Sequence, residues 1–85
     1  MSTIIRITVL YFANVKDITG VKKETMNLTP DTSIKKLLTN ISSKYPAIKS
    51  ILDVVKISVN YKMMEMNTIL NDGDEVALLP PVSGG

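Results

Sequence analysis

One amphipathic helix pattern constrains the fold of this chain more than any other feature. Between residues 34 and 45, apolar side chains recur at the i, i+3, i+4, i+7 and i+11 positions of one helical face: Ile34, Leu37, Leu38, Ile41 and Tyr45. Asp31 or Thr32 is expected to cap the first amides of this helix, and Pro46 is expected to end it. Because no second helix of this length is predicted, the apolar stripe must pack against a sheet.

Strand patterns precede this helix. Residues 4–12 are rich in β-branched and aromatic side chains that alternate between two faces, and residues 23–28 alternate in the same way. The segment between them, residues 13–19, predicts a short helix that stops at Gly20. The two strands are therefore expected to pair as a hairpin.

Further strand patterns follow the main helix. Residues 54–59 predict a third strand, and a turn at residues 60–62 leads into a short edge segment, residues 63–66. Residues 75–79 predict the last strand, which Pro80 and Pro81 terminate.

The order of these elements predicts an α+β fold of the β-grasp, ubiquitin-like kind, with a mixed sheet of roughly four to five strands packed on one main helix. The first and last strands are expected to lie side by side and parallel in the middle of the sheet. The predicted domain spans residues 1–81, and a flexible Gly-Gly tail spans residues 82–85. A chain of 85 residues can bury one modest core.

The residue types that are absent exclude most catalytic chemistry. The chain has no histidine and no cysteine, so it offers no zinc ligand set, no Ser-His or Cys-His nucleophile and no disulfide. Asp72, Asp74 and Glu75 are the remaining carboxylate cluster, but Asp72 and Asp74 flank Gly73 as turn residues do. We expect no metal site, no cofactor bound by the chain itself and no catalysis by the chain alone.

Charge and hydropathy narrow the range of partners. The net charge is only +2, and the lysines are dispersed without interleaved aromatic residues, which argues against nucleic-acid binding. No apolar run approaches the ~18 residues of a membrane helix, and no basic-then-apolar leader precedes the first strand. The chain is expected to be cytoplasmic and to bind neither nucleic acid nor membrane.

The C-terminal letters LLPPVSGG raise the question of a reactive end. Without Cβ atoms, Gly84 and Gly85 can thread a narrow channel, and the prolines before them keep the sheet from capturing the tail. A terminal carboxylate is a poor electrophile, so a partner that uses ATP would first have to activate it as an acyl-adenylate. A chance Gly-Gly in a mobile end is the alternative, and these two letters alone leave it open.

Residues 70–85, LNDGDEVALLPPVSGG, carry a more specific signal. This run closely resembles the end of the small, sulfur-carrying subunits of molybdopterin synthase, whose pattern is L-x-D-G-D-E-V-A, two apolar residues, then P-P-V-[SAT]-G-G. Residues 9–13, VLYFA, and residues 18–20 also resemble the first strand and the short helix of that family. Residues 21–55 match it in pattern more than in letters.

The resemblance implies a sulfur carrier in molybdenum cofactor biosynthesis. In this family an E1-like adenylyltransferase uses ATP to activate the terminal glycine, and a sulfur donor protein converts it to a thiocarboxylate. The tail then enters the active site of the large synthase subunit, where the sulfur passes to cyclic pyranopterin monophosphate. Carried over to this chain, Gly85 bears the sulfur and Gly84 lets the tail thread, so no thiol is required.

Other β-grasp proteins share parts of this signature. The thiamine-pathway sulfur carrier has the same fold and Gly-Gly end but is usually shorter and lacks the double proline. Carriers for tRNA thiolation and ubiquitin-like protein modifiers use the same adenylate. A plain β-grasp binding domain with an incidental tail is the alternative of a different class, and incubation with an adenylating enzyme, ATP and a sulfur source separates it from a carrier.

Strand alternation predicts an apolar patch beside the tail. The first strand is expected to turn Leu10 and Phe12 away from the main helix, and the last strand is expected to do the same with Ala77 and Leu79. We expect Phe12, Met63 and Leu79 to anchor the large subunit and, in turn, the adenylating enzyme. The predicted partner-binding residues are Leu10, Phe12, Met63, Leu79, Pro80, Pro81, Val82 and Ser83. The alternative is that the short helix after Phe12 folds over the patch.

Three methionines cluster in the predicted edge segment. Met63, Met64 and Met66 lie in a stretch that is too short and polar to be a core strand of its own. Met63 is expected to be exposed, and one of the other two is expected to be buried, because flexible methionine fills gaps in a core well.

Overall fold

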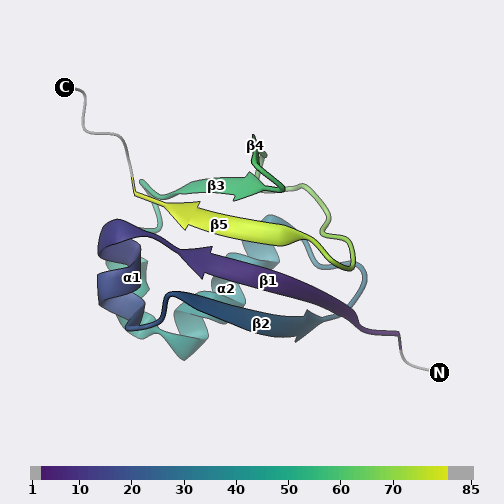
Figure 1. The fold of residues 1–85 in the computed structure, drawn as a ribbon, viewed down its shortest axis with the longest axis horizontal. Helices are drawn as coiled ribbons and strands as arrows, with labels where there is room; N and C mark the ends of the chain where they lie inside the picture. The colour runs from purple at the N-terminus through teal and green to yellow at the C-terminus, as the bar shows by residue number, and fades with distance from the viewer. Residues whose placement is uncertain (1–2, 81–85) are drawn as a thin grey trace.

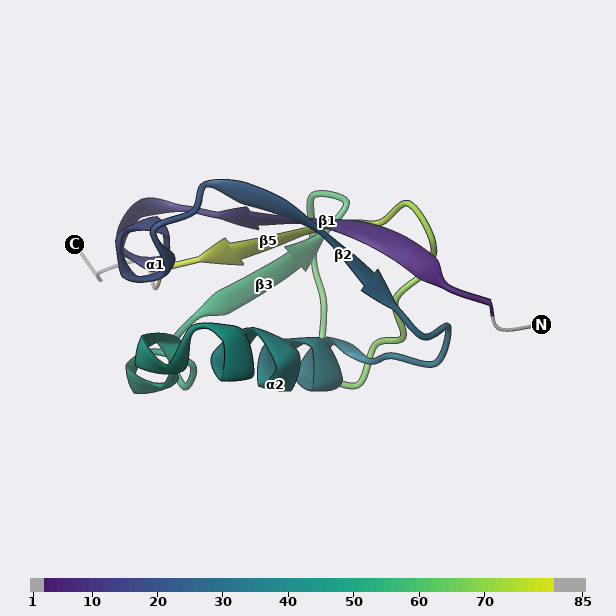
Figure 2. The ribbon, with the colours of Figure 1, turned by 90° about the horizontal axis from the view of Figure 1, so that it is seen from below.

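The fold is a five-stranded mixed sheet with its longest helix packed across one face, as the computed structural model, which describes residues 3–80, shows (Figures 1 and 2). Its elements in chain order are β1 (Ile5–Tyr11), α1 (Ala13–Thr19), β2 (Lys23–Leu28), α2 (Ile34–Lys44), the 3-10 helix η1 (Pro46–Ser50), β3 (Lys56–Val59), β4 (Lys62–Met63) and β5 (Glu75–Leu79).

The strand order confirms the predicted β-grasp arrangement. The strands run β2-β1-β5-β3-β4 across the sheet, and β1 and β5 are parallel neighbours in its middle. The other pairs are antiparallel, including the predicted β1–β2 hairpin, in which Ile5 lies opposite Leu28. The parallel register sets Tyr11 beside Leu78, so the two central strands present matching faces.

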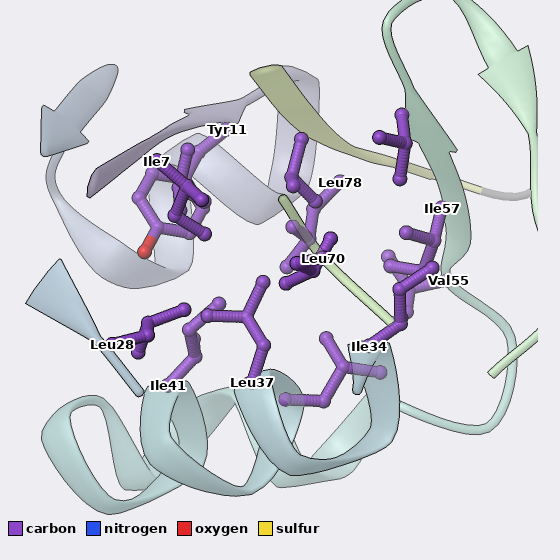
Figure 3. Close-up of a cluster of buried hydrophobic side chains, with 14 of the residues drawn as sticks. Ile7, Tyr11, Leu28, Ile34, Leu37, Ile41, Val55, Ile57, Leu70 and Leu78 are labelled. Atoms are coloured by element: carbon purple, nitrogen blue, oxygen red, sulfur yellow. The ribbon is translucent and has the colours of Figure 1, made fainter. Parts of the chain in front are cut away.

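The core lies between the sheet and α2 (Figure 3). Val9 and Tyr11 of β1 and Leu78 of β5 are almost completely buried, and so are Leu37 and Ile41 of α2. These residues follow the period of two in the strands and the period of three to four in the helix, as the sequence predicts. Burial of this apolar stripe is the main force that holds α2 on the sheet.

The short helix α1 begins and ends where the sequence predicts. Gly20 ends it in the left-handed conformation, with φ 74°, and its N–H donates to the carbonyl of Lys16 at 2.8 Å. Glycine reaches this backbone conformation without steric cost, which explains the sharp stop.

The predicted cap of α2 is wrong, because the residue in the cap position is Ser33. Its hydroxyl accepts a hydrogen bond from the Lys36 N–H at 3.2 Å. Thr32 is instead buried, with its hydroxyl bonded to that of Thr29 at 3.0 Å, and Asp31 is exposed. Both residues precede the cap position and belong to the connection from β2.

Two features that follow α2 differ from expectation. Tyr45 is the C-cap of α2, and Pro46 is the first residue of the next helix, η1. Proline is tolerated at the start of a helix because the N–H that it lacks would have no helical partner there. The edge segment predicted over residues 63–66 is a strand only at Lys62–Met63.

The methionine prediction is right for Met63 and wrong for its neighbours. Met63 is 58% exposed, but Met64 and Met66 are each 40% exposed, so neither is buried. The chain leaves the sheet after β4 and passes the start of α2, where the carbonyl of Met66 accepts from the Lys35 N–H at 2.9 Å. Leu70, only 1% exposed, enters the core from this loop in place of a methionine.

Candidate functional site

The face of the sheet opposite α2 has an apolar groove near the C-terminal end of its central strands. Leu10 points to this face because its neighbours Val9 and Tyr11 point into the core. The register of β1 and β5 sets Leu10 beside Ala77, and Phe12, directly after β1, is 44% exposed. The predicted outward orientation of Leu10 and Phe12 is confirmed.

β3 and β4 form the other side of this surface. Ser58 of β3 lies between Ala77 of β5 and Met63 of β4, and Leu79 ends β5 opposite Lys56. The hollow holds about 280 Å³ and is called the outer groove below. Its lining residues are Leu10, Phe12, Ser58, Tyr61, Met63, Glu75, Ala77 and Leu79. The structure thus brings together four of the predicted partner-binding residues: Leu10, Phe12, Met63 and Leu79. Their role in binding stays a prediction.

The helix α1 does not cover the outer groove. Its residues Val15 and Thr19 are buried, and it contacts η1 as well as β1 and β5. Figure 2 shows α1 at one end of the sheet. No residue of α1 lines the outer groove, so the alternative in which this helix folds over the apolar patch is wrong.

Lysines surround the outer groove on two sides. A second hollow of about 420 Å³ shares Leu10 and Phe12 with it and is also lined by Lys16, Lys22 and Lys23. On the other side, Lys56 lies opposite Leu79. The surface therefore combines an apolar floor with lysines on two sides and the Glu75 carboxylate in its lining, and the lysines suit a partner that carries carboxylates near its apolar anchors.

A hydrogen-bonded cluster behind the groove fixes the end of β1. Glu24 of β2 accepts from the Tyr11 hydroxyl at 2.6 Å and from the Tyr45 hydroxyl at 2.9 Å, and it pairs with Lys44. The rings of Tyr11 and Tyr45 meet edge to face, with centroids 5.9 Å apart. Tyr11 lies between Leu10 and Phe12 in the sequence, so the cluster anchors the strand that presents both side chains.

The pKa values of this cluster reflect these contacts. Burial raises the pKa of the Glu24 carboxyl, but the hydrogen bonds from Lys44, Tyr11 and Tyr45 outweigh it, and the net shift is downward. Burial, followed by the hydrogen bond to Glu24, raises the pKa of Tyr11 far above its ordinary value of 10.0. The same two causes raise the pKa of Tyr45.

The acidic residues before β5 act as turn residues. The Asp72 carboxylate accepts from the Arg6 N–H at 2.7 Å, and that of Asp74 accepts from the Asn71 N–H at 2.8 Å. Gly73 adopts φ 87°, which favours glycine. The Asp72 carboxylate thus ties the loop to β1, and the Asp74 carboxylate closes the loop on itself and binds the Asn60 side chain. Within residues 3–80, no group of three or more acidic side chains could hold a metal ion.

The groove lies at the point where the C-terminal run begins. Leu79 ends β5 and Pro80 follows it, and both are half-buried. The predicted site residues Pro81, Val82, Ser83, Gly84 and Gly85 lie outside the described residues. Among residues 3–80, no helix has both the length and the apolar character needed to cross a membrane.

Sequence reasoning missed Tyr61 as a residue of the outer groove. It was predicted only to be part of a turn, and it lines the groove from the tip of the β3–β4 hairpin. The sequence does carry one signal, the pair Asn60-Tyr61. A two-residue hairpin turn usually has glycine after asparagine, so a tyrosine in the glycine position is unusual and marks the residue for attention.

Known proteins are similar to this chain in both sequence and fold. The chain is 37% identical over 82 residues to the molybdopterin synthase sulfur carrier subunit of Chlamydomonas reinhardtii, a match that covers 94% of this chain and 99% of that protein. A Pyrococcus furiosus protein assigned as subunit 1 of molybdopterin converting factor has a TM-score of 0.86 and 28% identity, covering 92% of this chain and 99% of the other.

A solved complex is also similar. A chain from the complex of subunits 1 and 2 of molybdopterin-converting factor from Helicobacter pylori has a TM-score of 0.69 and 30% identity, covering 95% of this chain and 100% of the other. The sequence model of the ThiS family matches residues 9–85. With most of its length matched by that model, and with a relative this similar over nearly all of both sequences, the chain belongs to the ThiS family.

Proposed function

We propose that this chain is the sulfur-carrier subunit of molybdopterin synthase and that it carries sulfur as a thiocarboxylate on Gly85. The observation that carries the proposal is the position of the outer groove, which lies where β5 ends and the run P-P-V-S-G-G begins. A docking surface beside a tail lets a partner bind the domain and receive the chain end. The names of the similar proteins support the same function.

The chemistry divides between this chain and its partners. An E1-like adenylyltransferase joins the Gly85 carboxylate to the α-phosphate of ATP and releases pyrophosphate. Sulfide (HS−) delivered by a sulfur donor protein then attacks the acyl carbon and displaces AMP, which leaves the thiocarboxylate on Gly85. This chain contributes the carboxyl group, the tail and the docking surface, and ATP binds to the partner.

The large synthase subunit is the proposed acceptor partner. The Helicobacter pylori complex of subunits 1 and 2 supports such a pairing. In the proposed complex Phe12, Met63 and Leu79 contact the large subunit, while Pro80 leads the tail toward its active site. The sulfur then passes to cyclic pyranopterin monophosphate. The proposed location is the cytoplasm, where ATP is available for the first step.

Intact mass measurement tests the carrier function. The full chain is incubated with the adenylating enzyme, ATP and a sulfur donor, and the expected product has the mass increase of one oxygen exchanged for sulfur. Adding the large subunit and cyclic pyranopterin monophosphate should return the chain to its original mass and yield molybdopterin. This second step separates the proposed pathway from thiamine synthesis, tRNA thiolation and protein modification.

Deletion of Gly85, or addition of one residue after it, should abolish both mass changes. The unfolding midpoint should stay unchanged in both variants, because the change lies beyond β5. Gly84→Ala should slow the reaction through its added Cβ. Wild-type rates of molybdopterin formation by the deletion variant would overturn the assignment of Gly85.

A further inference from the structure

Tyr61 has a backbone conformation that disfavours a bulky side chain. Val59 and Lys62 pair across the β3–β4 hairpin, and the two residues between them, Asn60 and Tyr61, have φ of 51° and 71°. Two positive φ values define a type I′ turn, in which asparagine suits the first position and glycine the second. Tyrosine in the second position is strained, because its Cβ crowds the backbone in the left-handed region.

The rest of the hairpin holds Tyr61 in this conformation. The side chain of Asn60 donates to the Asp74 carboxylate at 2.9 Å and accepts from the Glu75 N–H at 3.0 Å. The Asn60 N–H also donates to the Glu75 carbonyl at 2.8 Å. Three hydrogen bonds thus fix the turn to the start of β5, and strain of this kind persists only where the surrounding structure over-determines it.

The ring of Tyr61 contributes little to the stability of the folded domain. The residue is 89% exposed, the largest exposure among the large hydrophobic residues described. No residue within 3–80 forms a hydrogen bond with its hydroxyl in the structure. An exposed aromatic ring on a strained backbone that the neighbouring hydrogen bonds hold in place, and that stabilises no core, is better explained by a contact with another molecule than by folding.

The position of Tyr61 points to a protein partner. It lines the outer groove with Met63 and Glu75, so its ring extends the apolar surface of the groove to the tip of the β3–β4 hairpin. Tyrosine is enriched at protein interfaces because it supplies a large, amphipathic contact area at a low cost in side-chain entropy.

We propose that Tyr61 is an anchor for the large synthase subunit, which packs on the Tyr61 ring at the hairpin end of the outer groove. This inference rests on the proposed function and adds to it a contact residue outside the groove floor. The strain in the turn then lowers the stability of the domain, while the ring raises its affinity for the partner. Replacing Tyr61 by glycine should therefore raise stability and lower affinity.

Tyr61→Gly tests the proposal by its effect on stability and affinity together. The variant should have a higher thermal unfolding midpoint than wild type, because glycine adopts φ 71° without strain. Its Kd for the cognate large subunit, measured by isothermal titration calorimetry with the full chain, should rise about tenfold, as expected when an aromatic anchor is removed. Tyr61→Phe, which keeps the ring, should bind within about twofold of wild type.

Four results would each contradict one part of this reasoning about Tyr61. Equal affinity of wild type and Tyr61→Gly would overturn the anchor role while leaving the proposed function in place. A lower unfolding midpoint for Tyr61→Gly would overturn the strain argument, and a loss in Tyr61→Phe as large as in Tyr61→Gly would overturn the assignment to the ring. No binding by the wild-type chain would instead refute the proposed function itself.

Discussion

Glu24 joins three elements of the fold through one carboxylate. It lies on β2 and binds Tyr11 of β1 and Lys44 of α2, and it also binds Tyr45, which follows that helix. Its side chain is only 11% exposed. The two phenol donors and the ammonium group together compensate for burying the charge.

The hydrogen bonds of Glu24 with Tyr11 and Tyr45 should make the free energy of unfolding depend on pH in both acidic and alkaline solution. The pKa of Glu24 is lower when folded than its ordinary value of 4.5, so the unfolded chain binds more protons on acidification. The contribution of Glu24 is therefore complete above pH 4.5 and is lost as pH falls through the lower, folded pKa. The pKa values of Tyr11 and Tyr45 are raised above 10.0, so their contribution is complete below pH 10.0 and declines as the pH rises above it.

Glu24→Gln should remove most of the acid dependence. The amide keeps the size of the side chain but loses the charge, so the free energy of unfolding at neutral pH should fall by about 1–2 kcal/mol. Urea unfolding from pH 3 to pH 7 checks this, with Glu65→Gln in the exposed loop after β4 as the control. Equal pH profiles for wild type and Glu24→Gln would contradict the role of the cluster.

At the scale of elements, the start of α2 shows what a sequence pattern can and cannot predict. The apolar stripe places the helix correctly from Ile34 onward, because side-chain periodicity is a local property. The first amides also depend on a distant loop: the Ile34 N–H donates to the Thr68 carbonyl at 2.9 Å, and the Lys35 N–H donates to that of Met66. Such pairing over thirty residues leaves no local pattern, so the sequence does not show which residue before Ile34 takes the cap position, and the expectation that Met64 or Met66 is buried is wrong.

Ser33→Ala should destabilise the domain by about 1 kcal/mol, because it removes the hydroxyl that accepts from Lys36 at the helix start. Ser43→Ala is the matched control in the last turn of the same helix, where an exposed serine becomes a better helix former. Thermal and urea unfolding of both variants checks the difference. A Ser33→Ala variant as stable as Ser43→Ala would show that the loop carbonyls alone satisfy the helix start.

At the scale of the whole molecule, the two faces of the sheet have separate tasks. The inner faces of β1 and β5 bury Val9 and Leu78 against α2, while the outer faces of the same strands present Leu10 and Leu79. The alternation of side chains along the strands predicts this division, and it also predicts an apolar patch at the end of the last strand. Tyr61 escaped prediction because its role depends on backbone strain at a turn, which hydropathy does not reveal.

In the proposed function the large subunit and the adenylating enzyme both dock on the outer groove, which predicts that they exclude each other. Both would act on the same chain end, and the groove is lined by Leu79, the last residue of β5. Phe12→Asp and Leu79→Asp should leave a folded monomer and weaken both complexes by roughly 2 kcal/mol or more, because each puts a charge into an apolar contact.

Titration calorimetry with each partner, and competition with both present, checks this prediction. Asn40→Asp on the exposed side of α2 is the control for added charge, and it should bind both partners as the wild type does. A ternary complex of the chain with both partners would refute mutual exclusion. Unchanged affinity of folded Leu79→Asp for both partners would refute the groove as the docking surface, because Leu79 lines the groove and is the last residue of β5 before the C-terminal run.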